Sequence, residues 1–213
     1  MLVKRYKRFL ADVQLNGALV TAHCANPGRM TSCMEPGGRI WLSRSDNPKR
    51  KLKYSWELSE VGSARVMVNT ARANQVVKEG LLGVLGGSHL ESEVRHGDSR
   101  IDFRIDSTRW VEVKSVTLRD DQGIGAFPDA PTERGRKHLR ELTSIAREGG
   151  SATLFFLISR TDVSTVRPAD EVDPKYGDAL RGAMDAGVKV LAYRLQVDGR
   201  ELTLGEPAEV RRR

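Results

Sequence analysis

Hydrophobic and polar residues alternate in short runs through the first third of the chain, which is typical of β-strands. Residues 9–13 lead through Asn16-Gly17, a strong hairpin signal, into a second run at residues 18–23. Asn26-Pro27-Gly28 is a turn ahead of a further apolar run at residues 39–42. Several short strands separated by turns predict a small antiparallel barrel. Spacing alone does not distinguish an OB-like barrel from an SH3-like one.

From about residue 67 the pattern changes to longer apolar runs and amphipathic segments. Residues 66–68 are a short apolar run, and Asn69 and Thr70 can cap a helix that runs to about Leu82. The remaining predicted elements are a hairpin of residues 93–95 and 101–105, a strand at 110–116, a helix at 131–148, a strand at 152–158, a helix at 174–186 and a strand at 188–193. Residues 123–129 are predicted to be a loop, and the chain after Gly199 a polar tail. Such an order favours a mixed sheet with helices on both faces.

The two patterns predict two domains, a small all-β barrel over residues 1–66 and an α/β domain over residues 67–213. Composition supports a folded chain, because 39% of the residues are hydrophobic and 30% are charged. Nothing in the sequence approaches a membrane-spanning run or a signal peptide, so we expect a cytoplasmic protein. Cys24 and Cys33 do not have the spacing of a zinc site, and we expect two buried or half-buried thiols.

The positive charge of the chain is concentrated in the first domain. Residues 1–66 contain twelve Lys and Arg against five Asp and Glu, a balance of +7, whereas residues 67–213 contain 23 of each. A concentrated positive field suits a polyanion-binding surface. Charge alone does not establish nucleic acid as the partner.

Three ionisable residues lie within the predicted sheet, where a structural role alone would not select them. Asp102 lies between Ile101 and Phe103, and a period of two places Glu112 and Lys114 on the same face of the next strand. Two converging carboxylates need a counter-charge, and Mg²⁺ commonly takes one or two carboxylates in addition to water and phosphate oxygens. Lys114 can then stabilise developing charge. The alternative is a solvated strand face with a cross-strand ion pair.

Asp102 followed by Glu112-Val113-Lys114 resembles the core of PD-(D/E)xK nucleases. Several longer runs resemble the sugar fermentation stimulation protein A (SfsA) family. They are residues 5–13, Ser45-Asp46-Asn47 with Lys49-Arg50-Lys51, Val68-Asn69-Thr70, and residues 99–103, 112–118, 127–130 and 132–142. One departure from the family is that little sequence precedes Arg5-Tyr6, which could remove an early strand or arm.

This resemblance implies an N-terminal OB-like domain, a C-terminal restriction-endonuclease-like domain and DNA binding. Carried onto matching positions, it makes Asp102 and Glu112 metal ligands, the Val113 carbonyl a third ligand and Lys114 the catalytic lysine. Many nucleases of this type use a further acidic residue. Glu79 and Glu93 are the candidates, and Glu93 is favoured because it lies on a strand of the same sheet.

Two further sets of basic residues are candidates for nucleic-acid contacts. Those of the first domain alternate with aromatic residues, as in single-strand-binding OB domains, although any one aromatic can equally belong to the barrel core. They are Arg5, Lys7, Arg8, Lys49, Arg50, Lys51 and Lys53. Those of the second domain, Arg134, Lys137 and His138, lie in the first turns of a predicted helix, where phosphate is favoured, or else form a solvated helix face.

Together these observations predict a DNA-binding protein with a nuclease site that uses Mg²⁺, with Mn²⁺ as a possible substitute. The alternative is a DNA-binding transcriptional regulator of sugar metabolism whose nuclease-like core does not cleave. A version of either that acts on RNA is a third possibility. Strand preference, sequence specificity and oligomeric state are left open by the sequence.

Overall fold

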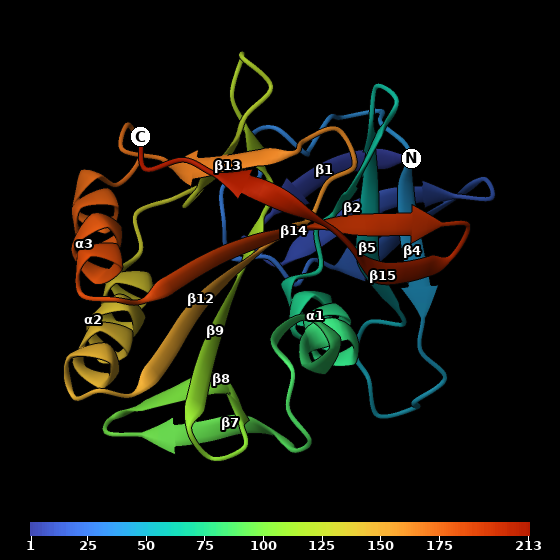
Figure 1. The fold of residues 1–213 in the computed structure, drawn as a ribbon. Coiled ribbons are helices and arrows are strands. Elements are labelled where there is room, and N and C mark those ends of the chain that lie inside the picture. The colour runs from blue at the N-terminus through green and yellow to red at the C-terminus, as the bar shows by residue number, and fades with distance from the viewer.

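The first sheet of the computed structural model, which describes residues 1–213, is built from the N-terminal third of the chain (Figure 1). Its strands are β1 (Leu2–Tyr6), β2 (Leu10–Leu15), β3 (Ala18–His23), β4 (Ile40–Arg44), β5 (Tyr54–Val61) and β6 (Ala64–Met67). The strand order is β1-β2-β3-β5-β4, and β6 pairs with β5. Trp56 lies fully buried in the core of this unit, together with Val13 and Ala22.

Local sequence explains the β2–β3 hairpin. Asn16 and Gly17 both have positive φ, of 50° and 84°, as the favoured two-residue hairpin turn requires. Leu15 consequently pairs with Ala18, and Leu10 with His23. The short N-terminus does not remove the early strand, because β1 is present and pairs with β2.

The second sheet has nine strands, in the order β10-β11-β13-β15-β14-β12-β9-β8-β7. Their bounds are β7 (Leu90–His96), β8 (Ser99–Ile105), β9 (Arg109–Val116), β10 (Leu118–Arg119), β11 (Gly125–Phe127), β12 (Ser151–Ile158), β13 (Thr165–Pro168), β14 (Lys189–Asp198) and β15 (Glu201–Val210). β12 pairs in parallel with both β9 and β14, and β7 to β9 form an antiparallel meander. The predicted mixed sheet is therefore confirmed.

Helices cover both faces of this sheet (Figure 1). On one face, α1 (Thr70–Leu85) packs its buried Val77 and Leu81 against Phe103 and Val111. On the opposite face lie α2 (Glu133–Arg147) and α3 (Pro174–Asp185), which share a core with residues of β9 and β12. The predicted alternation of β9 follows from these layers, because Val111 and Val113 face α1 whereas Glu112 faces α2 and α3.

Several predicted boundaries need correction. The segment predicted as a polar tail contains β15, a ten-residue strand that pairs with β14 and β13. The predicted loop at 123–129 contains β11, and the strand predicted at 66–68 is β6, which pairs within the first sheet. α1 continues through Gly83 to Leu85. α2 begins at Glu133 rather than at Pro131, because Thr132 caps it.

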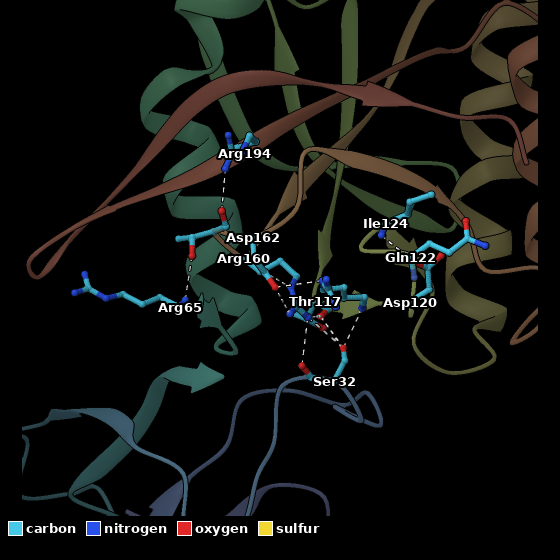
Figure 2. Close-up of polar contacts among 11 residues, drawn as sticks. Ser32, Arg65, Thr117, Asp120, Gln122, Ile124, Arg160, Asp162 and Arg194 are labelled. Carbon is cyan, nitrogen blue, oxygen red and sulfur yellow. Dashed lines mark hydrogen bonds and ion pairs between the residues drawn. The ribbon is translucent and has the colours of Figure 1, made fainter. Parts of the chain in front are cut away.

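The two sheets are joined directly, without a flexible linker. Val66 of β6 forms a β-bridge with Arg160, and the Met67 amide donates to the Ser159 carbonyl at 2.7 Å. Figure 2 shows Arg160 at this joint, where its guanidinium reaches Asp162, the Thr117 carbonyl and Ser32 of the first domain. The side chain of Arg160 is only 2% exposed, so its guanidinium is shielded from water, whereas its partner Asp162 is 30% exposed. The core under α1 also includes Leu58 and Met67 of the first sheet, so the two units share apolar packing.

Both cysteines are buried and unpaired, as expected from their spacing. None of the helices combines the length and the apolar character needed to cross a bilayer.

Candidate metal centre

Asp102 lies where strands β8 and β9 separate. The two strands pair from Ile105 with Arg109 to Phe103 with Val111, and the pairing stops before Asp102. The Asp102 carboxylate enters the resulting gap, where Oδ2 accepts from the Val113 amide at 2.7 Å. Oδ1 accepts from the Asn74 side chain of α1, also at 2.7 Å. The carboxylate is thus held from both the strand and the helix.

Glu112 is buried beneath α2 and α3, with an exposed fraction of only 1%. A buried carboxylate is costly unless it is paired, so the alternative of a solvated strand face is wrong at this position. Its Oε1 is paired with the Lys114 ammonium and with His138 of α2.

Both ring nitrogens of His138 have partners. Nδ1 contacts Glu112 Oε1, and Arg134 Nε donates to Nε2 at 3.4 Å. A neutral imidazole with its proton on Nδ1 satisfies both contacts. The Lys114 amine lies 3.3 Å from the same Nδ1. Glu112, Lys114 and His138 therefore form one compact polar cluster, with Arg134 at its outer side.

The two carboxylates have opposite pKa shifts. Burial and the nearby negative charge of Glu112 together raise the pKa of Asp102 to about 6. Burial also raises the pKa of Glu112, but Lys114 and His138 outweigh it and hold this pKa below its usual value. At neutral pH both groups are therefore anionic, and Asp102 carries an electrostatic penalty that a cation would relieve.

One unpartnered atom tests whether these residues fit a metal ion. Glu112 Oε2 is buried and has no hydrogen-bond partner, although a buried carboxylate oxygen normally has one. This free oxygen, near the charge of Asp102, matches the hard oxygen ligands that Mg²⁺ prefers. No group of three or more His, Cys, Asp or Glu side chains is close enough to hold a metal ion. Backbone oxygen, water or phosphate would have to complete the coordination.

The remaining predicted site residues are distributed around this cluster. Glu93 lies on β7 with positive φ and an exposed side chain, and Glu79 is exposed on α1. Neither residue is joined to Asp102 or Glu112 by a hydrogen bond. His138 is 5% exposed and faces Glu112, so it lies inside the cluster rather than on the predicted phosphate-contacting helix face. Lys137 donates to the Asp98 carbonyl, and Arg134 remains exposed.

Two residues of the site were not found from the sequence. Asn74 contacts Asp102 directly, and Tyr176 of α3 is fully buried with an unpartnered hydroxyl. Burial together with the charge of Glu112 raises the pKa of Tyr176. Asn74 belongs to no motif in the sequence. It lies one helical turn beyond Thr70, on the same helix as the candidate Glu79.

The basic residues of the first domain are arranged on two loops of the barrel. The loop between β1 and β2 displays Lys7 and Arg8, both with positive φ, beside Phe9, which is 43% exposed. Arg5 is less available, because its guanidinium donates to the Arg8 and Asn26 carbonyls. The loop between β4 and β5 contains exposed Lys49, Arg50, Lys51 and Lys53. In OB barrels with this strand order, these two loops flank the oligonucleotide-binding face.

Comparison with known proteins identifies both domains. The family model described as "SfsA N-terminal OB domain" matches residues 3–68, and the one described as "Sugar fermentation stimulation protein RE domain" matches residues 65–201. The OB-like barrel and the restriction-endonuclease-like domain predicted from the resemblance are thereby confirmed.

Similar proteins cover the chain from end to end. A "Sugar fermentation stimulation protein homolog" of Pseudomonas syringae pv. syringae is 49% identical over 222 residues, which is 98% of this chain and 94% of that protein. Its counterpart in Pseudomonas aeruginosa PAO1 is 49% identical over 223 residues, 99% of this chain and 95% of that protein. A solved structure, Pyrococcus furiosus SfsA in complex with Ca²⁺, superposes with a TM-score of 0.89 at 27% identity, covering 99% of this chain and 94% of that one.

Proposed function

The chain belongs to the sugar fermentation stimulation protein (SfsA) family, and on this premise we propose that it is a DNA-binding protein with a magnesium-dependent nuclease site. The observation that carries the proposal is the buried, unpartnered Glu112 Oε2 beside the charged Asp102. The charge of Glu112 adds to the electrostatic cost of the Asp102 carboxylate, and a bound divalent cation would offset that cost.

Asp102, Glu112 and the Val113 backbone would hold the ion. When bound, Mg²⁺ polarises phosphate oxygens and lowers the pKa of a coordinated water. The Lys114 ammonium, already beside Glu112, is positioned to stabilise negative charge that develops on a phosphate. His138 keeps Glu112 oriented, and the exposed Arg134 can contact a neighbouring phosphate.

The OB domain supports nucleic acid as the substrate. Its two basic loops lie at the positions that contact oligonucleotides in other OB barrels, and the domain has a net charge of +7. Exposed Phe9 adds an aromatic surface on which an unstacked base can lie. DNA is the substrate that the family resemblance favours, and RNA is an alternative for the same chemistry.

The relative from Pyrococcus furiosus was solved with Ca²⁺, which is a hard divalent cation with oxygen ligands like Mg²⁺. The fold of this relative matches nearly the whole of the present chain. Its Ca²⁺ therefore supports the proposal that the present chain also binds a divalent cation. Ca²⁺ often occupies Mg²⁺ sites without supporting the same chemistry, and the active metal is therefore part of the experiment below.

A second candidate function is a DNA-binding regulator of sugar metabolism that does not cleave. The specific observation in its favour is that only two carboxylates converge, with no third acidic side chain close enough to complete a metal site. Both oxygens of Asp102 are also engaged by hydrogen bonds. A binding protein that retains the architecture without turnover would have these features.

One experiment separates the two candidates. Purified full-length protein is incubated with single-stranded DNA, duplex DNA and RNA in Mg²⁺, Mn²⁺ or EDTA, beside the Asp102→Ala variant. Cleavage that requires the metal and is lost in Asp102→Ala supports the nuclease. DNA binding without cleavage under every metal condition refutes it and supports the regulator.

A further inference from the structure

A cavity away from the candidate metal centre lies at the junction of three elements. Strands β4 and β5 of the OB domain form one side, α1 forms the second, and the tip of the β14–β15 hairpin closes the third. Its volume is about 570 Å³, within the range of small-molecule sites. No part of the proposed nuclease chemistry uses it.

One wall of this cavity is a rigid aromatic surface. The Trp41 indole Nε1 donates to Glu60 at 2.8 Å, which fixes its edge. The Arg65 guanidinium lies over the ring, 5.5 Å from its centroid, and fixes one face. An aromatic side chain held in this way can stack on a planar ligand at a small cost in conformational entropy.

The adjoining polar wall is built around Glu57, whose side chain is 13% exposed. Glu57 Oε1 accepts from Ser43, and Oε2 accepts from Asn69 at 2.8 Å and from Arg72 at 3.3 Å. A carboxylate has about four acceptor positions, so these three bonds leave one for a donor on a ligand. Glu57 is therefore a fixed acceptor beside the Trp41 ring.

Charged groups without partners surround the cavity opening. Arg200, in the hairpin turn, makes no ion pair, and neither does Glu79 on α1. An unpaired guanidinium is suited to a phosphate, which it binds in a bidentate manner. The opening thus offers a site for an anion, and the interior offers a stacking surface and an acceptor.

We propose that this cavity binds a nucleoside monophosphate unit, with its base on Trp41, an amino group of the base toward Glu57 and the phosphate at Arg200. The carboxylates of Glu57 and Glu79 accept hydrogen bonds and suit the exocyclic amino groups of adenine, guanine and cytosine. Uracil offers only its ring N3–H, flanked by two carbonyl oxygens that a carboxylate repels, so the other three bases are favoured. The unit comes either from a free nucleotide or from a nucleotide within a bound strand.

The cavity and the metal centre lie on different sides of α1. Asn74 reaches Asp102, whereas its helix neighbours Arg72 and Gln75 line the cavity, because successive helical residues point in different directions. The two sites share a helix but no side chain. Nucleotide binding in the cavity is consequently independent of whether the metal centre cleaves.

Isothermal titration calorimetry of the full-length protein in EDTA tests the proposal with AMP, GMP, CMP and UMP. Wild-type protein is expected to bind the first three at least threefold more tightly than UMP. The Gln75→Trp variant, which fills the cavity from an exposed helix position, should weaken binding at least tenfold. Arg200→Glu should weaken it about tenfold, as expected for a lost charge-assisted hydrogen bond. Arg147→Glu, an exposed charge change at the end of α2, is the matched control and should have no effect.

The same titrations with short single-stranded oligonucleotides distinguish the two sources of the ligand. If only oligonucleotides bind and Gln75→Trp weakens them, the unit comes from a strand. Tryptophan fluorescence gives the location, because quenching by the ligand should be lost in Trp41→Phe, which preserves the packing of a ring. The proposal is overturned if neither mononucleotides nor oligonucleotides bind, or if Gln75→Trp binds them as tightly as the wild type.

Discussion

Replacing Asp102 by Asn should stabilise the metal-free protein, and the gain should grow with pH. In the unfolded chain this carboxyl loses its proton near pH 3.8, whereas in the fold its pKa is about 6. Between these values the folded state retains a proton that the unfolded state has released. The stability that Asp102 contributes is therefore fully present below pH 3.8 and is lost as the pH rises through about 6.

The magnitude follows from the same two values. A difference of one pKa unit between the folded and unfolded states corresponds to about 1.4 kcal/mol. The charged Asp102 carboxylate therefore lowers the free energy of unfolding by about 3 kcal/mol above pH 6. For a chain of this size about 3 kcal/mol corresponds to a shift of roughly 6–12 °C in Tm. Asp102→Asn also changes the hydrogen bonds with Asn74 and Val113, which adds an offset that does not depend on pH. The test is therefore how the stability difference between wild type and Asp102→Asn changes with pH, and not its value at one pH.

The measurement is urea or thermal unfolding of wild type and Asp102→Asn in EDTA from pH 4 to pH 8. Adding Mg²⁺ at pH 7.5 should stabilise the wild type by about 2.7 kcal/mol at one hundred times its Kd, and should stabilise the variant much less. Asp178→Asn, at an exposed carboxylate of α3, controls for general loss of negative charge. A difference between wild type and Asp102→Asn that is constant across this pH range would refute the reasoning, as would equal stabilisation of both by Mg²⁺.

Three further predictions concern the joint and the OB loops. Arg160→Met should lower the free energy of unfolding by about 3 kcal/mol in urea denaturation, because Asp162 and the Thr117 carbonyl lose a buried partner. An unchanged free energy of unfolding would show that Arg160 does not hold the joint. Reversing charge at Lys49, Lys51 and Lys53 together should reduce the slope of log K against log salt for duplex DNA by about 3, and an unchanged slope would place the DNA elsewhere. Phe9→Ala should weaken single-stranded DNA binding by roughly fivefold to a hundredfold, measured by fluorescence anisotropy, with duplex binding and Tm unaffected.

Much of the secondary structure could be predicted because the local signals agree with the tertiary environment. The Asn16-Gly17 turn, the Asn69 cap of α1 and the apolar run of β12 each specify one conformation. β15 is not evident from the sequence because most of its exposed positions are polar or charged and Gly205 and Pro207 interrupt it. Leu202 and Leu204 do alternate with polar residues there, but a short alternation is persuasive only once a partner strand is known.

The candidate site was predictable only in part, for a similar reason. The alternation around Glu112 and Lys114 was sufficient to place both on one face of β9, and the structure agrees. Burial of Glu112 could not be deduced, since it depends on α2 and α3 covering that face. The contact of Asn74 with Asp102 arises because β8 and β9 separate at that point, and the sequence carries no local signal for the separation.

The direct joint between the two sheets has a consequence for any strand that the protein binds. A module on a flexible linker samples many positions, and it delivers its ligand to a neighbouring site over a range of offsets. Here β6 and the Arg160 contacts hold the OB loops at one distance and orientation from Asp102. The distance between the OB loops and the metal centre is therefore fixed. If the metal centre cleaves, the ends of the products should lie a constant number of nucleotides from the segment bound by the OB loops.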